Sequence, residues 1–368
     1  MEKSKRWTGK KEKNIVKYIQ ICVWYNAQGG KIMNKRMLRV FVVMLVGIFM
    51  LTCCKKTVGT PEDNPITEED TDGDEKDENE NETFKFGFSA IDMENPYFIT
   101  LESAITEVLD EYGYELIVKD PASDADNQAS QIEEMIDEGI DAIFISPVNW
   151  EKITPSLQKL KDAGIKIINV DTQVKEMDYV DAYIGSDNKK AGYICGQDLV
   201  ERCPDGGKIL ILECPTQNSI NDRITGFEEA ISTAENGFEV IERKDTNGEF
   251  EIAMEVTKEI LEQHPDINII MCGNDQIAVG AKTAVNVLNM NDVIIYGVDG
   301  SPDIKKELKK SDNQIAGTAA QSPINIGKVS AQIGIDMLLG EDYEKETYED
   351  VFMINEDNVD MYGVDGWQ

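Results

Sequence analysis

Short apolar runs rich in β-branched residues alternate with longer segments of helical periodicity over most of the chain from Phe84 onward. The short runs are typical of buried strands, and the longer segments carry apolar residues on one face, which is typical of amphipathic helices. This alternation predicts βαβ units, whose right-handed crossovers place the strands parallel. The predicted strands are FKFGFSAI, YELIVK, DAIFISP, IKIINVD and VDAYIGSD in a first series, and KILILECP, FEVIER, INIIMC, VIIYGVD and QIAGTAA in a second.

The two series of strands indicate two doubly wound α/β lobes with parallel sheets. A helix SPINIGKVSAQIGIDMLLG follows the second series and has no unit left to join there, so we expect it to return to the first lobe. The tail through VFMINEDN then crosses back. The predicted N-terminal lobe is 84–186 plus 322–349, and the predicted C-terminal lobe is 187–321 plus 350–368. Several crossings predict a hinge, near Ser186 and Ser322, about which the lobes close.

Polar residues follow four of the predicted strands, namely Asp171, Asn274, Asp299 and Gln321. The carboxyl ends of parallel strands meet at one edge of a sheet, and ligands of open α/β sheets bind outside that edge. A carboxylate accepts from two hydroxyls, and an amide both donates and accepts. We therefore predict that these four residues line a cleft for a hydroxylated ligand. Helix capping is the alternative role of Asp171 and Asp299.

Arg223 is a further candidate, because we expect it at the start of a helix, where a cation opposes the helix dipole. Its guanidinium fork suits two adjacent hydroxyls; a solvent-exposed side chain is the alternative. Asn95 offers a donor and an acceptor from the first lobe. Asp275 is expected to cap the helix that begins at Gln276 rather than to contact ligand.

The front of the chain differs in charge from the rest. The formal net charge of the 368 residues is −34, yet residues 1–53 hold eleven Lys or Arg against two acidic residues. Within them, residues 40–51 are apolar or Gly without a charge. A basic segment before an apolar run too short to span a bilayer predicts a signal peptide. Met33 is an alternative start to Met1, in which case residues 1–32 are not translated.

The predicted signal peptide ends in LTCC, which resembles a lipobox and makes Cys54 the predicted site of lipid attachment, with Cys53 as the alternative. The acidic residues 54–83 have little to bury, so we predict a disordered tether. Two acyl chains on one cysteine would anchor the protein stably to a membrane surface. The predicted location is therefore extracytoplasmic, at the cell membrane.

Charge and motifs argue against several function classes. The strongly negative chain has no basic stripe, so nucleic acid is not an expected partner. His264 is the only histidine and lies in EQHPD at a predicted turn, and no nucleophile set can be assembled without it. No glycine-rich phosphate loop is present, so we predict neither an enzyme nor a cofactor. The cysteines of the body, Cys195, Cys203, Cys214 and Cys272, are interpreted as buried free thiols.

Six motifs resemble, in collinear order from Phe84 to about Asp360, the periplasmic sugar-binding family that includes the ribose and galactose receptors. They are residues 91–98, Asp171, DRITGF, MCGNDQIAVGA, YGVDGSPD and GTAAQSPINIG. The resemblance implies the type I periplasmic binding protein fold. It also implies a monomeric substrate-binding lipoprotein of an ABC-type sugar importer, with a permease and an ATPase as partners and a monosaccharide or polyol as ligand.

The resemblance further places stacking aromatics at Tyr97, Phe98 and Phe250, which would cover the apolar faces of a sugar ring. No metal is predicted, because the loop 203–207 is too short for the calcium site of galactose receptors. Thr172 stands where the ribose receptor has an arginine, which puts ribose in doubt. A hexose, another pentose, a cyclic polyol or a furanose-like signal molecule remain candidates. A sensor subunit that presents its ligand to a membrane kinase or chemoreceptor is the alternative function.

Overall fold

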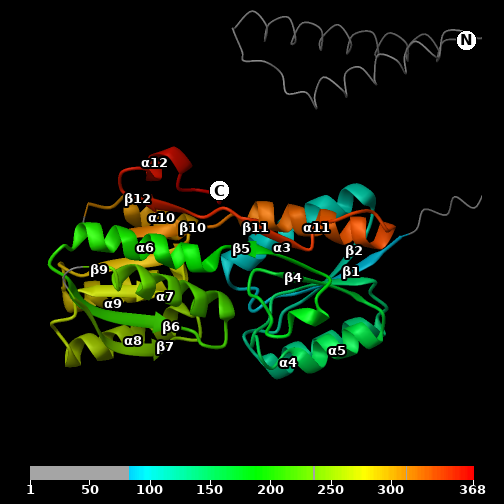
Figure 1. Cartoon of the computed structure of the whole chain (residues 1–368), viewed down its shortest axis with the longest axis horizontal. Helices are drawn as coiled ribbons and strands as arrows, with labels where there is room; N and C mark the ends of the chain where they lie inside the picture. The colour runs from blue at the N-terminus through cyan, green and yellow to red at the C-terminus, as the bar shows by residue number, and fades with distance from the viewer. Residues whose placement is uncertain (1–82, 235–236, 312) are drawn as a thin grey trace, which may run out of the picture. The chain divides into compact units, whose positions relative to one another are not determined.

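The computed structural model describes residues 83–234, 237–311 and 313–368. The predicted signal peptide, the lipid site at Cys54 and nearly all of the tether lie outside the described residues. Two six-stranded sheets organise this part of the chain, each with helices on both faces (Figure 1). The predicted fold class, two α/β lobes built on parallel sheets, is confirmed. No helix in the described ranges has the length and apolar character needed to cross a membrane.

The N-terminal lobe is built on a sheet of order β11-β5-β4-β3-β1-β2 in which every pair is parallel. Its elements are β1 Lys85–Ser89, α3 Pro96–Tyr112, β2 Glu115–Lys119, α4 Ala125–Asp137, β3 Ala142–Ile145, α5 Thr154–Asp162, β4 Lys166–Val170, the 3-10 turn η1 Met177–Tyr179, β5 Ala182–Ser186, α11 Pro323–Leu339 and β11 Glu346–Glu349. Helices α3 and α11 pack together, and α4 packs with α5.

The C-terminal lobe is built on a sheet of order β12-β10-β9-β8-β6-β7, parallel except for the antiparallel pair β10 and β12. Its elements are α6 Asn188–Arg202, β6 Gly207–Glu213, α7 Asn218–Ile231, β7 Phe238–Asp245, α8 Phe250–Gln263, β8 Ile269–Cys272, α9 Asp275–Leu288, β9 Ile294–Asp299, α10 Pro302–Leu308, β10 Ile315–Ala320, β12 Phe352–Asn355 and α12 Val359–Tyr362. The chain passes between the two sheets three times, after β5, after β10 and after β11.

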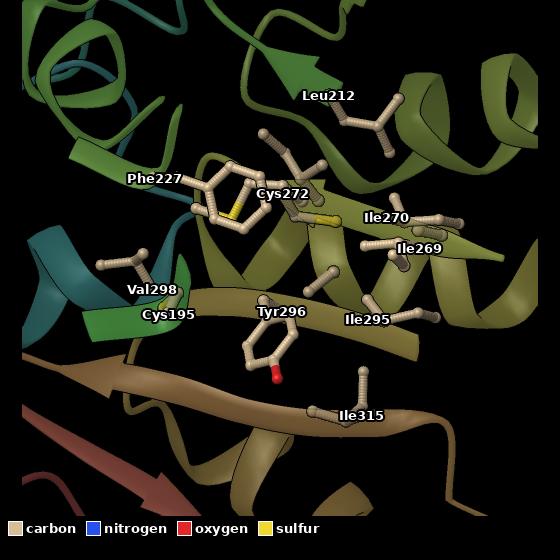
Figure 2. Close-up of a cluster of buried hydrophobic side chains, with 14 of the residues drawn as sticks. Cys195, Leu212, Phe227, Ile269, Ile270, Cys272, Ile295, Tyr296, Val298 and Ile315 are labelled. Carbon is tan, nitrogen blue, oxygen red and sulfur yellow. The ribbon is translucent and has the colours of Figure 1, made fainter. Parts of the chain in front are cut away.

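Apolar side chains on both faces of the second sheet form the core of the C-terminal lobe. Figure 2 shows three members of this core, Tyr296 on β9, Ile270 on β8 and Phe227 on α7, and all three are fully buried. Cys195 and Cys272 lie in the same cluster as buried free thiols, as does Cys214, whereas Cys203 is only half-buried. Near-continuous apolar strands are expected where helices cover both faces of a parallel sheet.

Glycines bring α6 and α7 into backbone contact. A Cβ on Gly192 would lie 1.7 Å from the Arg223 carbonyl oxygen, and one on Gly226 would lie 1.9 Å from the Lys189 carbonyl oxygen. No Cβ atom tolerates such distances, so both positions require glycine for this packing. The close approach fixes the rotation and height of α7 against the sheet. The position of the Arg223 side chain therefore depends on these two glycines.

Candidate functional site

Asp171 and Asp299 lie at the carboxyl ends of β4 and β9, one in each lobe, and both are buried. Their φ angles are 60° and 142°, in the half of conformational space that residues with a Cβ rarely adopt. Neither residue caps a helix, because Ser301 caps α10 and no α-helix begins directly after Asp171. Unfavourable backbone conformations at strand ends are a feature of binding and catalytic sites.

Arg223 connects the strand ends of the C-terminal lobe. It lies in the second turn of α7, which begins at Asn218, so the expectation that it starts the helix is wrong. It is only 3% exposed, which contradicts the alternative of a solvated side chain. Its Nε donates to Asn188 Oδ1 (2.8 Å) and its Nη1 donates to the Gly273 carbonyl oxygen (2.8 Å). Its Nη1 also lies 3.5 Å from Asp299 Oδ1.

The carboxylates outnumber this single guanidinium. Burial raises the pKa of Asp171, and it raises the pKa of Asp299 to about 8, while the Arg223 charge opposes both shifts. Asp275 is also buried and its pKa is raised by burial, although it accepts from the Ser301 backbone N–H and the Thr318 hydroxyl, both at 2.7 Å. A ligand that donated hydroxyl hydrogen bonds to these carboxylates would stabilise their ionised form.

Two polar atoms near this cluster are buried without a hydrogen-bond partner among the described residues. They are the hydroxyl of Tyr97 and Oε1 of Gln321. The other end of the Gln321 amide donates to Asp299 Oδ1 at 2.8 Å. The Tyr97 hydroxyl makes no hydrogen bond of good geometry, but it lies close enough to Asp171 to oppose the rise in the pKa of that carboxyl. An unpartnered buried polar atom costs about 1–3 kcal/mol, so such atoms indicate a place where a polar ligand is accommodated.

The predicted aromatics fall into two groups. Tyr97 and Phe98 are buried in the first turn of α3, with ring centroids 5.3 Å apart at an interplanar angle of 87°. Pro96 and the Asn95 cap, which accepts from the Tyr97 N–H at 3.0 Å, start the helix here. Phe250 is half-buried at the start of α8 and lines, together with Asn95, an outer hollow between the lobes. Phe250 and Asn95 are therefore placed at the rim, apart from the buried charges.

Asn274 has a local role that sequence reasoning assigned to its neighbour. Its side-chain oxygen accepts from the Ile277 N–H at 2.8 Å, so Asn274 caps α9 and the expectation of a cap at Asp275 is wrong. The Asn274 amide nitrogen donates to the Gly248 carbonyl oxygen at 3.2 Å. Asp275 instead holds the Ser301 and Thr318 groups described above, next to the Asp299 strand end.

Direct hydrogen bonds join the lobes beside this cluster. The Thr172 hydroxyl of the N-terminal lobe lies 2.7 Å from the Ser219 hydroxyl at the start of α7. The Trp150 N–H donates to the Thr216 carbonyl oxygen at 3.0 Å. Thr172 also donates to Asp171 Oδ2 at 3.1 Å. The lobes are therefore in contact across the cleft, which explains the burial of its charged residues.

Sequence reasoning missed Asn188 and Ser219. Asn188 starts α6 and binds Arg223 across 35 positions, and Ser219 meets Thr172 across 47 positions. Nothing in the local pattern distinguishes either residue from an ordinary polar residue at a helix start. In the described part of the chain, no group of three His, Cys, Asp or Glu side chains is arranged to hold a metal ion.

Comparison with known proteins gives a family model described as periplasmic binding protein domain, which matches residues 86–342. The ribose import binding protein of Bacillus subtilis (strain 168) is 26% identical over 307 residues, which are 83% of this chain and 95% of that protein. An ABC transporter solute binding protein from Mycobacterium smegmatis, solved with bound glycerol, gives a TM-score of 0.71 at 28% identity and covers 76% of this chain and 96% of its own. One from Actinobacillus succinogenes 130z, with bound D-allose, gives 0.69 at 25% identity and covers 76% of this chain and all of its own.

Proposed function

Because this chain belongs to the periplasmic binding protein family, whose members bind solutes rather than catalyse reactions, we propose that it is the substrate-binding component of an ABC-type sugar importer. Its ligand is a monosaccharide or related polyol, held between the two lobes and delivered to a permease and ATPase. The relatives support this proposal, since they include a ribose import binding protein and a solute binding protein with bound D-allose.

The buried cluster of Asp171, Arg223, Asp299 and Gln321 is the observation that carries the proposal. A guanidinium fork and two strand-end carboxylates can each hold two neighbouring hydroxyls of a sugar. The Tyr97 hydroxyl can donate to or accept from a ligand hydroxyl, and Gln321 Oε1 can accept from one. In this proposal Tyr97 and Phe98 cover one face of the ring, while Phe250, Asn95 and Asn274 complete the site from the rim.

The charges of the site limit the chemistry of the ligand. Arg223 is the single cation beside three buried carboxyl groups, Asp171, Asp275 and Asp299, so it has no charge to spare for an anionic ligand in a site of low effective dielectric. A neutral ligand rich in hydroxyl donors fits. Thr172 donates its hydroxyl hydrogen to Asp171 and meets the Ser219 hydroxyl, so its side chain has no donor left for the ligand on that side of the site.

A thermal-shift screen of the purified protein tests this proposal. D-ribose, D-allose, D-galactose and myo-inositol represent the candidate pentoses, hexoses and polyols, and D-glucuronate is the anionic control. We expect at least one neutral member to raise the melting temperature in a saturable manner, since a ligand at about a hundred times its Kd adds about 2.7 kcal/mol. Stabilisation by glucuronate alone would contradict the proposed site, and no shift with any hydroxylated ligand would contradict the function.

The lobes close, in this proposal, as the two bodies 84–186 plus 322–349 and 187–321 plus 350–368, with the hinge near Ser186 and Ser322. The protein acts as a monomer outside the cytoplasm and is held at the membrane by lipid on Cys54, with Cys53 as the alternative. Mass spectrometry of the mature N-terminus distinguishes the two cysteines, and a mature protein without lipid would contradict the anchor.

A further inference from the structure

Residues 364–368 follow α12 and are held by the C-terminal lobe. Val364 packs against the core of that lobe. The Gly366 carbonyl oxygen accepts a hydrogen bond from Lys305 Nζ on α10, and a main-chain oxygen of Gln368 accepts one from the Ser322 hydroxyl at the start of α11. The segment is therefore fixed both to the body of the C-terminal lobe and to one of the three crossings between lobes.

Trp367, between these two attachment points, reaches the N-terminal lobe. Its side chain packs against the core cluster of that lobe. Its ring lies edge-on to Tyr97, with centroids 5.8 Å apart at an angle of 78°. Aromatic rings prefer this arrangement, in which the positive edge of one ring meets the negative face of another. Trp367 thus contacts the buried tyrosine that carries an unpartnered hydroxyl.

Lys305 explains why the segment stays in place. Its side chain is buried, and burial lowers its pKa because the ammonium loses water. A buried ammonium requires acceptors. The segment supplies the Gly366 carbonyl oxygen and, with the Gln368 amide oriented so that both of its ends are paired, the Gln368 amide oxygen. The Gln368 amide nitrogen then faces the Gly300 carbonyl oxygen at 3.2 Å, directly after Asp299. The segment therefore contacts the neighbourhood of the site in both lobes.

We propose that residues 364–368 act as a strap across the two lobes, in which Trp367 is a positioning residue that holds the Tyr97 ring in the cleft. The strap is attached to the C-terminal lobe and presses on an aromatic of the N-terminal lobe, so its contacts are complete only when the lobes are together. It consequently favours the closed arrangement and slows release of the ligand. This inference rests on the proposed function, because Tyr97 is placed in the ligand site there.

Calorimetric titration of the full chain tests the effect on affinity, with whichever of D-ribose, D-allose, D-galactose and myo-inositol binds most tightly. Trp367→Ala removes the aromatic pair with Tyr97, so we expect it to weaken binding by about three- to tenfold. Most of the change should be in the rate of release, as is usual for contacts made after encounter. Trp367→Phe keeps an aromatic edge and should restore most of the affinity. Tyr362→Ala, which removes an aromatic from α12 that stacks on Phe352, is the matched control and should bind as the wild type does.

Hydrogen exchange of the ligand-free protein tests the positioning role without any sugar. Trp367→Ala should speed exchange in the first turns of α3, where Tyr97 lies, and Tyr362→Ala should not. Unchanged exchange in α3, or unchanged affinity with a sugar that the wild type binds, would overturn the strap. If the wild type bound none of the four compounds, the proposed function would fail, and the exchange measurement alone would decide the strap.

Discussion

Replacement of Arg223 by alanine tests whether this residue binds the ligand or only supports the structure. In the structure its guanidinium donates two hydrogen bonds of 2.8 Å and lies 3.5 Å from Asp299. Hydrogen bonds to charged groups contribute about 1.5–3 kcal/mol each. If further N–H groups of the guanidinium make two such hydrogen bonds to sugar hydroxyls, Arg223→Ala should weaken binding by at least about tenfold and up to about a thousandfold. A difference of about 1.4 kcal/mol is a factor of ten in affinity.

The same change should also destabilise the ligand-free protein. Removing one partner of a buried ion pair costs about 3–5 kcal/mol, because the other charge is left without compensation. Asp299 can take up a proton to relieve part of this cost, since burial already raises its pKa to about 8. We therefore expect a loss near the lower end of that range at neutral pH, where Asp299 is already largely protonated, and a larger loss above about pH 8, where the pair is ionised.

Arg243→Ala is the matched control, since Arg243 lies in the same lobe and pairs with Glu213 and Glu228 at the surface. Exposed pairs of this kind contribute about 0–1 kcal/mol, and no effect on affinity is expected. The measurements are calorimetric titration with the sugar found by screening and chemical denaturation without ligand. Unchanged affinity of Arg223→Ala, together with lost stability, would refute the proposed contact with ligand and leave Arg223 a structural residue.

Two further predictions concern the environment of Arg223. The raised pKa of Asp299 means that the folded protein binds more protons than the unfolded chain between about pH 4 and about pH 8, so this residue makes stability fall as pH rises through that window. In urea denaturation, Asp299→Asn should therefore lose less stability than the wild type as the pH rises from 5 to 8. It should also bind sugar much more weakly. Parallel pH profiles of stability for the two proteins would contradict the pKa argument. Gly192→Ala would place a Cβ against the Arg223 carbonyl oxygen, at 1.7 Å without relaxation, so α7 must shift. We expect lower stability by about 1–3 kcal/mol and weaker binding, whereas Gly340→Ala, at a left-handed helix end with open space, should lower stability without changing affinity.

Regular parts of the fold were predictable because local patterns determine them. Pro96 after an asparagine cap and Gly113 at the far end mark the two ends of α3. Asp171 and Asp299 were predictable as strand ends because an apolar run stops at each of them. Strand β11 was not predicted, since ETYE is polar and half-exposed and becomes a strand only by pairing with β5.

Parts of the candidate site depend on contacts between distant segments and left no local signal. The Asn188 side chain is recognisable as a partner only when α6 and α7 are packed through Gly192 and Gly226. The placement of Arg223 at a helix start failed because the turn before it contains polar residues, Asn218 and Ser219, that continue the helix instead of preceding it. The periodic pattern indicates that a helix exists more reliably than it indicates the first residue.

The threefold passage of the chain between lobes has a consequence for folding during synthesis. Strand β11 lies at the edge of the first sheet and pairs with β5. In the sequence, however, strands β6 to β10 of the second sheet come between β5 and β11. Until residues 346–349 are available, β5 presents an unpaired edge, which is a template for pairing with other chains. Domains usually fold in the order in which they are made, but here neither sheet is complete before residues 346–355, which hold β11 and β12. Loss of those residues would therefore impair both lobes.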